Sequence, residues 1–347
     1  MTKYQLAILI KTIVISIFIT SCNNGNVVDY TKNLTEIKGE YIPINELIGV
    51  PHEIIIKENL LIYVDPYEDF LLSVYDITRD SFSGRYLSRG NGPGEAIPPL
   101  RLFPSDQKNH FYVYQPNKQT LSSVSLPDFR LTDLVKFTLR PETVKKTKDF
   151  FVGAGIFEQG MFWFYDQNFN PVFEGGKYPF DGENRNQMEA SYVYQGSLCT
   201  NPTHNKFAFG CLYSDYLAFY EIKNNEIVVK KEYFSKDADV EFGSSTLENG
   251  ATMFRLFQKD NTVRNYNSSF GSGTYCYMLF NGKTNEENEK CRTCGNYIIV
   301  FDWDGNYIRT FQSDYEIFDF YVEEENNLIY AIVLGDDGEK NVAKFKL

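Results

Sequence analysis

A short hydrophobic pattern recurs six times along the chain and constrains its fold more than any other feature. Each copy places a turn-forming Asn or Gly before a hydrophobic run that carries an aromatic residue. The copies span residues 59–64, 109–113, 160–164, 205–209, 273–278 and 327–332, and begin 50, 51, 45, 68 and 54 residues apart. We ascribe the excess of the 68-residue step to a polar insertion, 281–290. Repeats of about 40–50 residues with three or four strands each are typical of propeller blades.

The two ends of the chain predict how the ring closes. After the sixth copy one strand remains, 341–347, which leaves the last blade one strand short of four. The strand at 40–44 is placed to complete that blade, and pairing the two ends would remove an exposed sheet edge. The sequence therefore predicts an all-β fold, a six-bladed β-propeller closed by an N-terminal strand. A β-sandwich is the competing architecture, but it does not explain six spaced repeats.

The first 22 residues have the form of a bacterial lipoprotein signal. Lys3 supplies a positive charge, residues 13–19 form a short apolar segment, and Thr20 and Ser21 precede Cys22. The apolar run is too short for a membrane span of about 20 residues. We expect a signal peptide over 1–21, a lipidated flexible tether over 22–36 and the propeller over 37–347. An uncleaved anchor, or an ordinary signal with a chance cysteine, is the alternative.

This N-terminus also predicts where the protein resides. The stretch 19–22 resembles the lipobox of bacterial lipoproteins, in which the cysteine is acylated and becomes the mature N-terminus. The resemblance implies a membrane partner through lipid on Cys22, hence a cell-envelope location. Asn23 and Asn24 follow the cysteine where no Asp stands, so we favour the outer membrane over the inner one.

The charge of the chain argues against nucleic acid as a partner. Removal of Lys3 and Lys11 with the signal leaves 32 basic and 46 acidic side chains, a net charge of −14. An acidic surface without a basic stripe repels phosphate backbones.

Five cysteines remain after Cys22, and an odd number leaves at least one thiol unpaired. We expect Cys276 to face the pair Cys291 and Cys294 across the insertion and to form one disulfide there. Cys199 and Cys211 bracket a predicted hairpin turn and are candidates for a second disulfide. Buried thiols are the alternative. A single Cys-x-x-Cys pair without a nearby His is half of a zinc site at most, so no metal is expected.

The most distinctive local sequence is the loop 88–95, with three glycines and a proline in five residues. Here the chain resembles the TolB-like or NHL-like six-bladed propeller lipoproteins of Gram-negative envelopes, many of which carry Gly-x-Gly-Pro-Gly-Glu after the first blade. The resemblance implies this fold and an envelope location. Exposed amides in the loop are a candidate binding site for an anion or a sugar hydroxyl; the alternative is a crossover turn in which the two charged residues pair with each other. The residues concerned are Arg89, Gly90, Gly92, Gly94 and Glu95.

No catalytic or cofactor motif stands out. The chain has three histidines, His52, His110 and His204, and no nucleophile elbow, metalloprotease helix or phosphate loop. Our first hypothesis is a non-catalytic binding or scaffold propeller that recognises a glycan, a peptide or an envelope protein, with no cofactor. The alternative is a glycan-active hydrolase or lyase at the central funnel, using acidic residues such as Asp65 with Glu68 or Asp69. Convergent carboxylates or a His in the funnel would favour the enzyme, and unlinked Tyr, Asn and Ser the binder.

Overall fold

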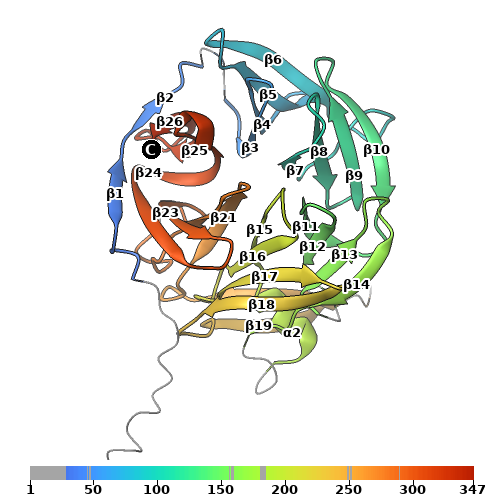
Figure 1. The fold of residues 1–347 in the computed structure, drawn as a ribbon, viewed down its shortest axis with the longest axis vertical. Coiled ribbons are helices and arrows are strands. Elements are labelled where there is room, and N and C mark those ends of the chain that lie inside the picture. The colour runs from blue at the N-terminus through green and yellow to red at the C-terminus, as the bar shows by residue number, and fades with distance from the viewer. Residues whose placement is uncertain are drawn as a thin grey trace, which may run out of the picture.

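The computed structural model describes residues 29–44, 46, 48–155, 157, 160–179, 185–247, 250, 252–288 and 290–347. The predicted signal peptide and Cys22 lie outside these residues. Six blades are arranged around a central axis, four of them separate sheets and the last two formed by one eight-stranded sheet, as Figure 1 shows in a view along that axis. No helix in the described part of the chain is long and apolar enough to cross a bilayer.

Blades 1 to 4 are antiparallel sheets of four strands whose first strand lies nearest the axis. Blade 1 contains β3 (His52–Lys57), β4 (Leu60–Tyr67), β5 (Phe70–Asp76) and β6 (Ser81–Ser88). Blade 2 contains β7 (Arg101–Pro104), β8 (His110–Gln115), β9 (Thr120–Ser125) and β10 (Arg130–Lys136). Blade 3 contains β11 (Pro141–Lys146), β12 (Phe151–Gly155), β13 (Phe162–Tyr165) and β14 (Pro171–Gly175). Blade 4 contains β15 (Gly196–Thr200), β16 (Lys206–Cys211), β17 (Leu217–Lys223) and β18 (Glu226–Tyr233).

Blades 5 and 6 share one long strand. Blade 5 contains β21 (Tyr266–Gly271), β22 (Tyr275–Phe280), β23 (Gly295–Asp302) and the first half of β24 (Tyr307–Glu323). The second half of β24 is the innermost strand of blade 6. It is followed by the 3₁₀ turn η1 (Glu324–Asn326), β25 (Leu328–Leu334) and β26 (Lys340–Lys346).

The N-terminal strand closes the ring. β2 (Gly39–Tyr41) pairs antiparallel with β26 and supplies the outer strand of blade 6. This confirms the predicted closure. β1 (Leu34–Ile37) adds a parallel strand to the outer edge of blade 5, with Leu34 opposite Thr310. Part of the segment expected as a tether over 22–36 is therefore bound to the propeller, because β24 offers it an open edge.

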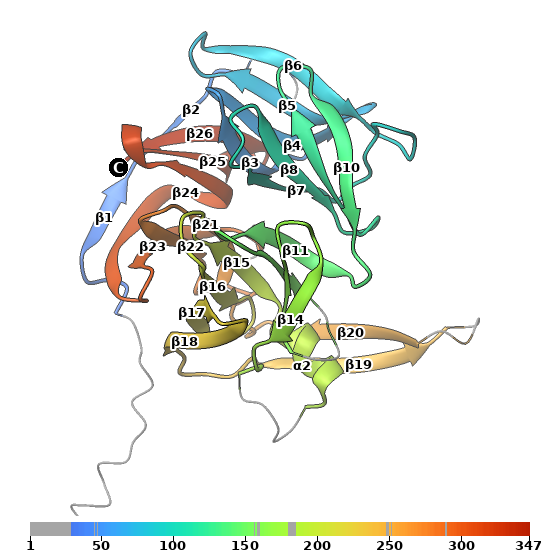
Figure 2. The ribbon, with the colours of Figure 1, turned by 45° about the vertical axis from the view of Figure 1, so that its right-hand side comes forward.

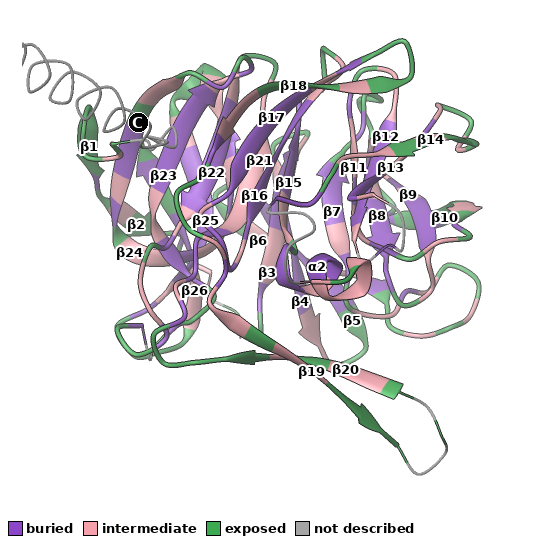
Figure 3. Cartoon of the chain, turned by 90° about the horizontal axis from the view of Figure 1, so that it is seen from below, coloured by how far each residue is buried: buried purple, intermediate pink, exposed green. Residues whose placement is uncertain are grey.

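The recurring runs are mostly second strands. Five of the six begin β4, β8, β16, β22 and β25, which are buried almost throughout because neighbouring blades cover both of their faces. Figure 3 shows this burial along the blades and exposure at their edges. The third run instead forms β13, the third strand of blade 3. Turn chemistry follows the sequence, as Asn224 and Asn225 both take positive φ (53° and 59°) in the β17–β18 hairpin.

The assignment of the long step to residues 281–290 is wrong. The extra residues form a separate hairpin, β19 (Val240–Thr246) and β20 (Thr252–Gln258), which follows blade 4 in the chain and projects from the body beside the short helix α2 (Gln187–Val193) (Figure 2). This helix lies against β19 and begins with a capping box between Asn186 and Glu189. Aromatic contacts join neighbouring blades, for example Phe162 of blade 3 and Phe207 of blade 4, with ring centroids 5.0 Å apart.

Candidate functional site

The innermost strands of all six blades enclose a cavity of about 260 Å³ around the axis. Each strand contributes at least one polar side chain to its wall. One from each, in blade order, is Glu53, Arg101, Glu142, Ser197, Asn267 and Asp319. We call this space the channel cavity.

Backbone bulges turn three of these side chains into the cavity. The pairing register of β3, β11 and β21 shifts at Glu53, Glu142 and Asn267 respectively, so each is the extra residue of its strand. Glu53 also has φ of 51°, which is uncommon for a residue with a Cβ. Bulges re-aim side chains and are frequent beside functional sites. Half of these six polar residues thus stand at irregular positions in otherwise regular strands.

Glu53 joins blade 1 to blade 2. Its carboxylate accepts a hydrogen bond from Arg101 Nη1 at 2.9 Å and another from the Leu102 amide at 3.2 Å. Burial alone would raise the pKa of Glu53, but the positive charges of Arg101 and Lys145 hold it below its usual value. Glu53 is therefore an ionised carboxylate with both oxygens engaged.

Asp319 joins blade 6 to its two neighbours. One carboxylate oxygen accepts the Ser268 hydroxyl from blade 5, and the other accepts the Ile54 amide of blade 1 at 2.9 Å. Burial and the negative charge of Glu53 raise the pKa of Asp319 to about 6. The two carboxylates therefore differ in their affinity for a proton although they share one cavity.

Other polar groups in the wall have bonding capacity left. Glu142 makes no hydrogen bond or ion pair with a residue that the structure describes. The side-chain oxygen of Asn267 is buried without a donor, while its nitrogen donates to the Cys294 carbonyl at 2.7 Å. Lys145 Nζ has one long hydrogen bond, 3.4 Å to the Leu102 carbonyl. The cavity thus presents one buried unsatisfied acceptor, the Asn267 oxygen, together with further hydrogen-bonding capacity on Glu142 and Lys145.

Aromatic side chains from the segment around α2 line one side of the cavity. Tyr178 and Tyr194 contribute to the wall there, with Gln195 beside them. The Tyr194 hydroxyl donates to Asp237 at 2.6 Å, and Arg185 contacts the same carboxylate at 2.5 Å. These bonds fasten the α2 segment to the chain that leads into the β19–β20 hairpin.

The glycine-rich loop lies away from the channel, at the crossover from β6 to β7. The Gly92 amide donates to the Glu95 carboxylate at 2.7 Å, and a Cβ on Gly90 would lie 2.0 Å from that carboxylate. Lys118 of blade 2 donates to the Gly90 and Glu95 carbonyls. Arg89 and Glu95 do not form an ion pair, so the pairing offered as the alternative is wrong. Because Glu95 is used inside the loop, a structural role accounts for its composition; Gly94 has φ of 79°, which favours glycine.

The cysteine pairing differs from expectation. Cys291 and Cys294 are joined to each other and not to Cys276, because Cys276 lies in β22 and faces blade 4. Cys199, Cys211 and Cys276 are buried thiols, and Cys211 is directed at the Tyr194 carbonyl, 3.6 Å away, not at Cys199.

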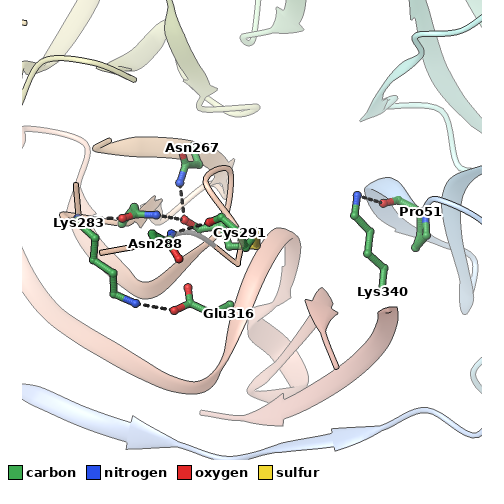
Figure 4. The surroundings of a disulfide bond; sticks show 9 residues. Pro51, Asn267, Lys283, Asn288, Cys291, Glu316 and Lys340 are labelled. Atoms are coloured by element: carbon green, nitrogen blue, oxygen red, sulfur yellow. Dashed lines mark hydrogen bonds and ion pairs between the residues drawn. A yellow bond between two sulfur atoms is a disulfide. The ribbon is translucent and has the colours of Figure 1, made fainter. Parts of the chain in front are cut away.

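The loop that carries the disulfide is held by side-chain amides. Asn288 donates to the Cys291 carbonyl at 2.5 Å, and Asn267 binds the Cys294 carbonyl, as Figure 4 shows. Lys283 and Glu316 form an ion pair at 2.5 Å nearby. The disulfide loop therefore positions Asn267 in the wall of the channel cavity.

The acidic residues and histidines singled out from the sequence lie outside the cavity wall. Asp65 is 1% exposed and accepts hydrogen bonds from the Gly49 amide and Ser73, which ties a loop to blade 1. Neither Glu68, Asp69 nor any of the three histidines lines the cavity. Among the described residues, no group of three or more His, Cys, Asp or Glu side chains is arranged to hold a metal ion.

Sequence reasoning missed Glu53, Arg101, Glu142 and Asp319. The available signal was a charged residue just before a hydrophobic run, or at its start, within a short strand. Glu53, which precedes three isoleucines, is an example. That signal is weak, because such residues also occur on exposed strand edges.

This geometry defines a six-bladed β-propeller with a polar channel. A family model described as TolB-like six-blade propeller-like matches residues 32–325, and the chain belongs to that family. The predicted family resemblance is thereby confirmed.

Two solved structures share the fold at low sequence identity. A Bacteroides fragilis NCTC 9343 protein thought to be exported has a TM-score of 0.54 and 12% identity, over 90% of this chain and 98% of that one. A member of the DUF4221 family from Bacteroides vulgatus ATCC 8482 has a TM-score of 0.52 and 14% identity, over 89% and 97%. No curated protein sequence matches the chain. These likenesses support the architecture.

Proposed function

We propose that this chain is an exported, non-catalytic binding protein whose channel cavity holds a small saccharide or one end of a glycan. The observation that carries the proposal is the hydrogen-bonding capacity left in the wall, where the Asn267 oxygen is buried and unsatisfied. Glu142 and the Asn267 oxygen lack donors, while Lys145 has donor capacity left. A sugar hydroxyl both donates and accepts, so adjacent hydroxyls can satisfy groups of both kinds.

Size and lining favour the same class of ligand. The volume of about 260 Å³ is just below the range of about 300–1,000 Å³ usual for small-molecule sites. That size suits one sugar residue better than a folded partner. Ser197 and Ser269 add hydroxyls that bond each other at 2.7 Å, and Tyr194 and Phe270 add ring surface.

The two converging carboxylates have structural partners. All four oxygens of Glu53 and Asp319 accept hydrogen bonds, each from a residue of an adjacent blade, and these bonds hold the ring together. This favours binding over catalysis. The alternative is a glycan hydrolase or lyase. Two observations favour it: three carboxylates, Glu53, Glu142 and Asp319, line the cavity, and the pKa of Asp319 is raised to about 6, a value suited to a general acid.

The location is proposed as the cell envelope, with lipid on Cys22. The lipobox-like N-terminus supports it, as does the likeness to a protein thought to be exported. Six residues lie between Cys22 and Asp29, where the described chain begins, and the seven Cα–Cα steps across them reach at most about 25 Å. The propeller would therefore stay close to the bilayer. Replacing Cys22 by Ala should abolish labelling with palmitate and release the protein from membranes; unchanged labelling would overturn the anchor.

The ligand class is tested by calorimetry on residues 27–347, which include every described strand, against mono- and disaccharides and dipeptides. We expect a saccharide to bind, Glu142→Gln and Asn267→Ala to weaken it at least tenfold, and Glu95→Gln in the distant loop to leave affinity unchanged. Mass spectrometry of the recovered ligand separates the two functions. If the recovered saccharide is chemically altered and Asp319→Asn abolishes this turnover, the protein is an enzyme and the binding function is wrong. If dipeptides bind and saccharides do not, the proposed ligand class is wrong.

A further inference from the structure

Two buried thiols meet at the boundary between blades 4 and 5. Cys199 lies on β15, the innermost strand of blade 4, and Cys276 lies on β22, the second strand of blade 5. Their sulfur atoms are 3.1 Å apart, and the residues are 1% and 0% exposed. Their contact joins two blades 77 positions apart in sequence.

The backbones around the thiols are packed too closely for other side chains to intervene. A Cβ on Gly271 of β21 would lie 2.1 Å from the Thr200 carbonyl and 3.1 Å from the Cys199 sulfur. The surrounding core is apolar and includes Met278 and Ile299. The two sulfurs are therefore held against each other by the packing of the blades.

We propose that Cys199 and Cys276 are a cross-linking site, at which oxidation forms a disulfide between blades 4 and 5. A disulfide needs sulfurs about 2.05 Å apart, so an approach of roughly 1 Å completes the bond. In the reaction one thiolate attacks a disulfide oxidant such as glutathione disulfide, giving a mixed disulfide and one glutathione thiolate. The second cysteine thiolate then displaces the other glutathione, so two protons leave the protein and two electrons reduce the oxidant.

The environment sets when this bond forms. Burial, together with the adjacent Cys199 sulfur, raises the pKa of the Cys276 thiol well above its usual value, which keeps the reactive thiolate scarce in the folded protein. Cys199 also lines a second cavity of about 420 Å³ that shares Lys145 with the channel cavity. We therefore expect the bond to form readily during folding, before the thiols are buried. In the folded protein it forms slowly, by oxidant entering through the second cavity.

The cross-link would act on the candidate site. Cys199 is two residues from Ser197, which lies in the channel wall. A bond to β22 fixes the position of β15 and closes a long loop of chain, which restricts the unfolded state. Oxidised protein should therefore be more stable than reduced protein.

The test uses residues 27–347 with Cys291→Ser and Cys294→Ser, so that three thiols remain. The protein is refolded with reduced and oxidised glutathione, blocked with iodoacetamide in denaturant and digested for mass spectrometry. We expect a peptide containing Cys199 linked to one containing Cys276, with Cys211 alkylated. We also expect a reductant to lower the Tm by about 5 °C or more. Three alkylated thiols, or a bond to Cys211, would overturn the proposal.

Two single variants on the same background serve as controls. Cys211→Ser should retain both the linked peptide and the effect of reductant on Tm, whereas Cys276→Ser should lose both. If Cys276→Ser fails to fold, counting thiols in denatured residues 27–347 with all five cysteines present decides the matter, since Cys291 and Cys294 are bonded to each other there. One free thiol per chain supports the cross-link, and three contradict it.

Discussion

The Glu53 carboxylate and the Arg101 guanidinium form an ion pair at 2.9 Å across the boundary between blades 1 and 2. The pair lies in the channel wall, with side-chain exposures of 18% and 35%, and Glu53 reaches it from a bulge with positive φ. One residue thus combines backbone strain, a contact between blades and a place in the candidate site.

Replacing Glu53 by Ala should lower the free energy of unfolding by about 1–3 kcal/mol, because Arg101 and the Leu102 amide lose their acceptor. This loss of stability is smaller than for a fully buried ion pair, because water reaches Arg101 and screens its charge. Glu53→Gly should cost about 1 kcal/mol less than Glu53→Ala, because glycine adopts φ of 51° without strain. Urea unfolding measures both variants. Equal stability of the two would mean that the bulge is unstrained.

Asp319→Asn should stabilise the protein at pH 8 by on the order of 2 kcal/mol and have little effect near pH 4. The pKa of Asp319 is raised from 3.8 to about 6 in the folded state, so folding favours its protonated form. Its contribution to stability is complete below about pH 4 and is lost as pH rises through 6. An Asn side chain stays neutral throughout: its oxygen can accept the Ile54 amide, while its nitrogen donates to the Ser268 hydroxyl, which then acts as the acceptor. Urea unfolding at pH 4, 6 and 8 tests this, with Glu68→Gln as an exposed control; a difference that does not vary with pH would contradict it.

A chain that begins at Ile42 should unfold at least 10 °C below one that begins at Asp29, or aggregate. It lacks β2, which leaves the edge of β26 unpaired.

A point substitution tests the same contact without deletion. A Cβ at Gly39 would lie 2.7–2.8 Å from the rings of Phe345 and Tyr315, so Gly39→Val should cost about 1–3 kcal/mol. The exposed neighbour is the control, since Lys38→Val should change stability by less than about 0.5 kcal/mol; thermal unfolding that shows equal losses would refute closure as the cause.

Replacing residues 240–261 by Gly-Ser should leave the six blades folded. The ends of the hairpin already meet, because Thr262 Oγ1 donates to the Asp239 carbonyl at 2.8 Å. Because the ends of the hairpin meet, we expect a Tm within about 5 °C of wild type. The deletion does uncover Tyr192 of α2, which contacts Phe242 and Phe254. Adding Tyr192→Ser should limit aggregation. Loss of the strand signal in circular dichroism would show that the hairpin is part of the folding core.

The number of blades and the ring closure were predictable because they rest on local pattern. Second strands such as β4 are buried on both faces, so each leaves a continuous hydrophobic run in the sequence. Closure followed from one missing strand at the C-terminus. The third run lies instead in the third strand of its blade, since β12 carries two glycines and reads as a weaker strand.

The channel wall was not predictable in the same way. Glu53, Glu142 and Asn267 reach the cavity through bulges, which depend on how each strand pairs with its neighbour. The β19–β20 hairpin was missed because the 281–290 segment is more polar, and we therefore assigned the extra residues of the long repeat step to that segment.

The sequence by itself determined the all-β class, the six repeats, the closure and the family, because burial and turn formation act over a few adjacent residues. Tertiary structure alone decided which charged residues meet at the axis and which cysteines approach each other. Cys199 and Cys276 come together across 77 positions, and Glu53 meets Arg101 across 48, through the curvature of the ring. No local pattern records a distance between blades, since each blade is placed by the packing of its neighbours.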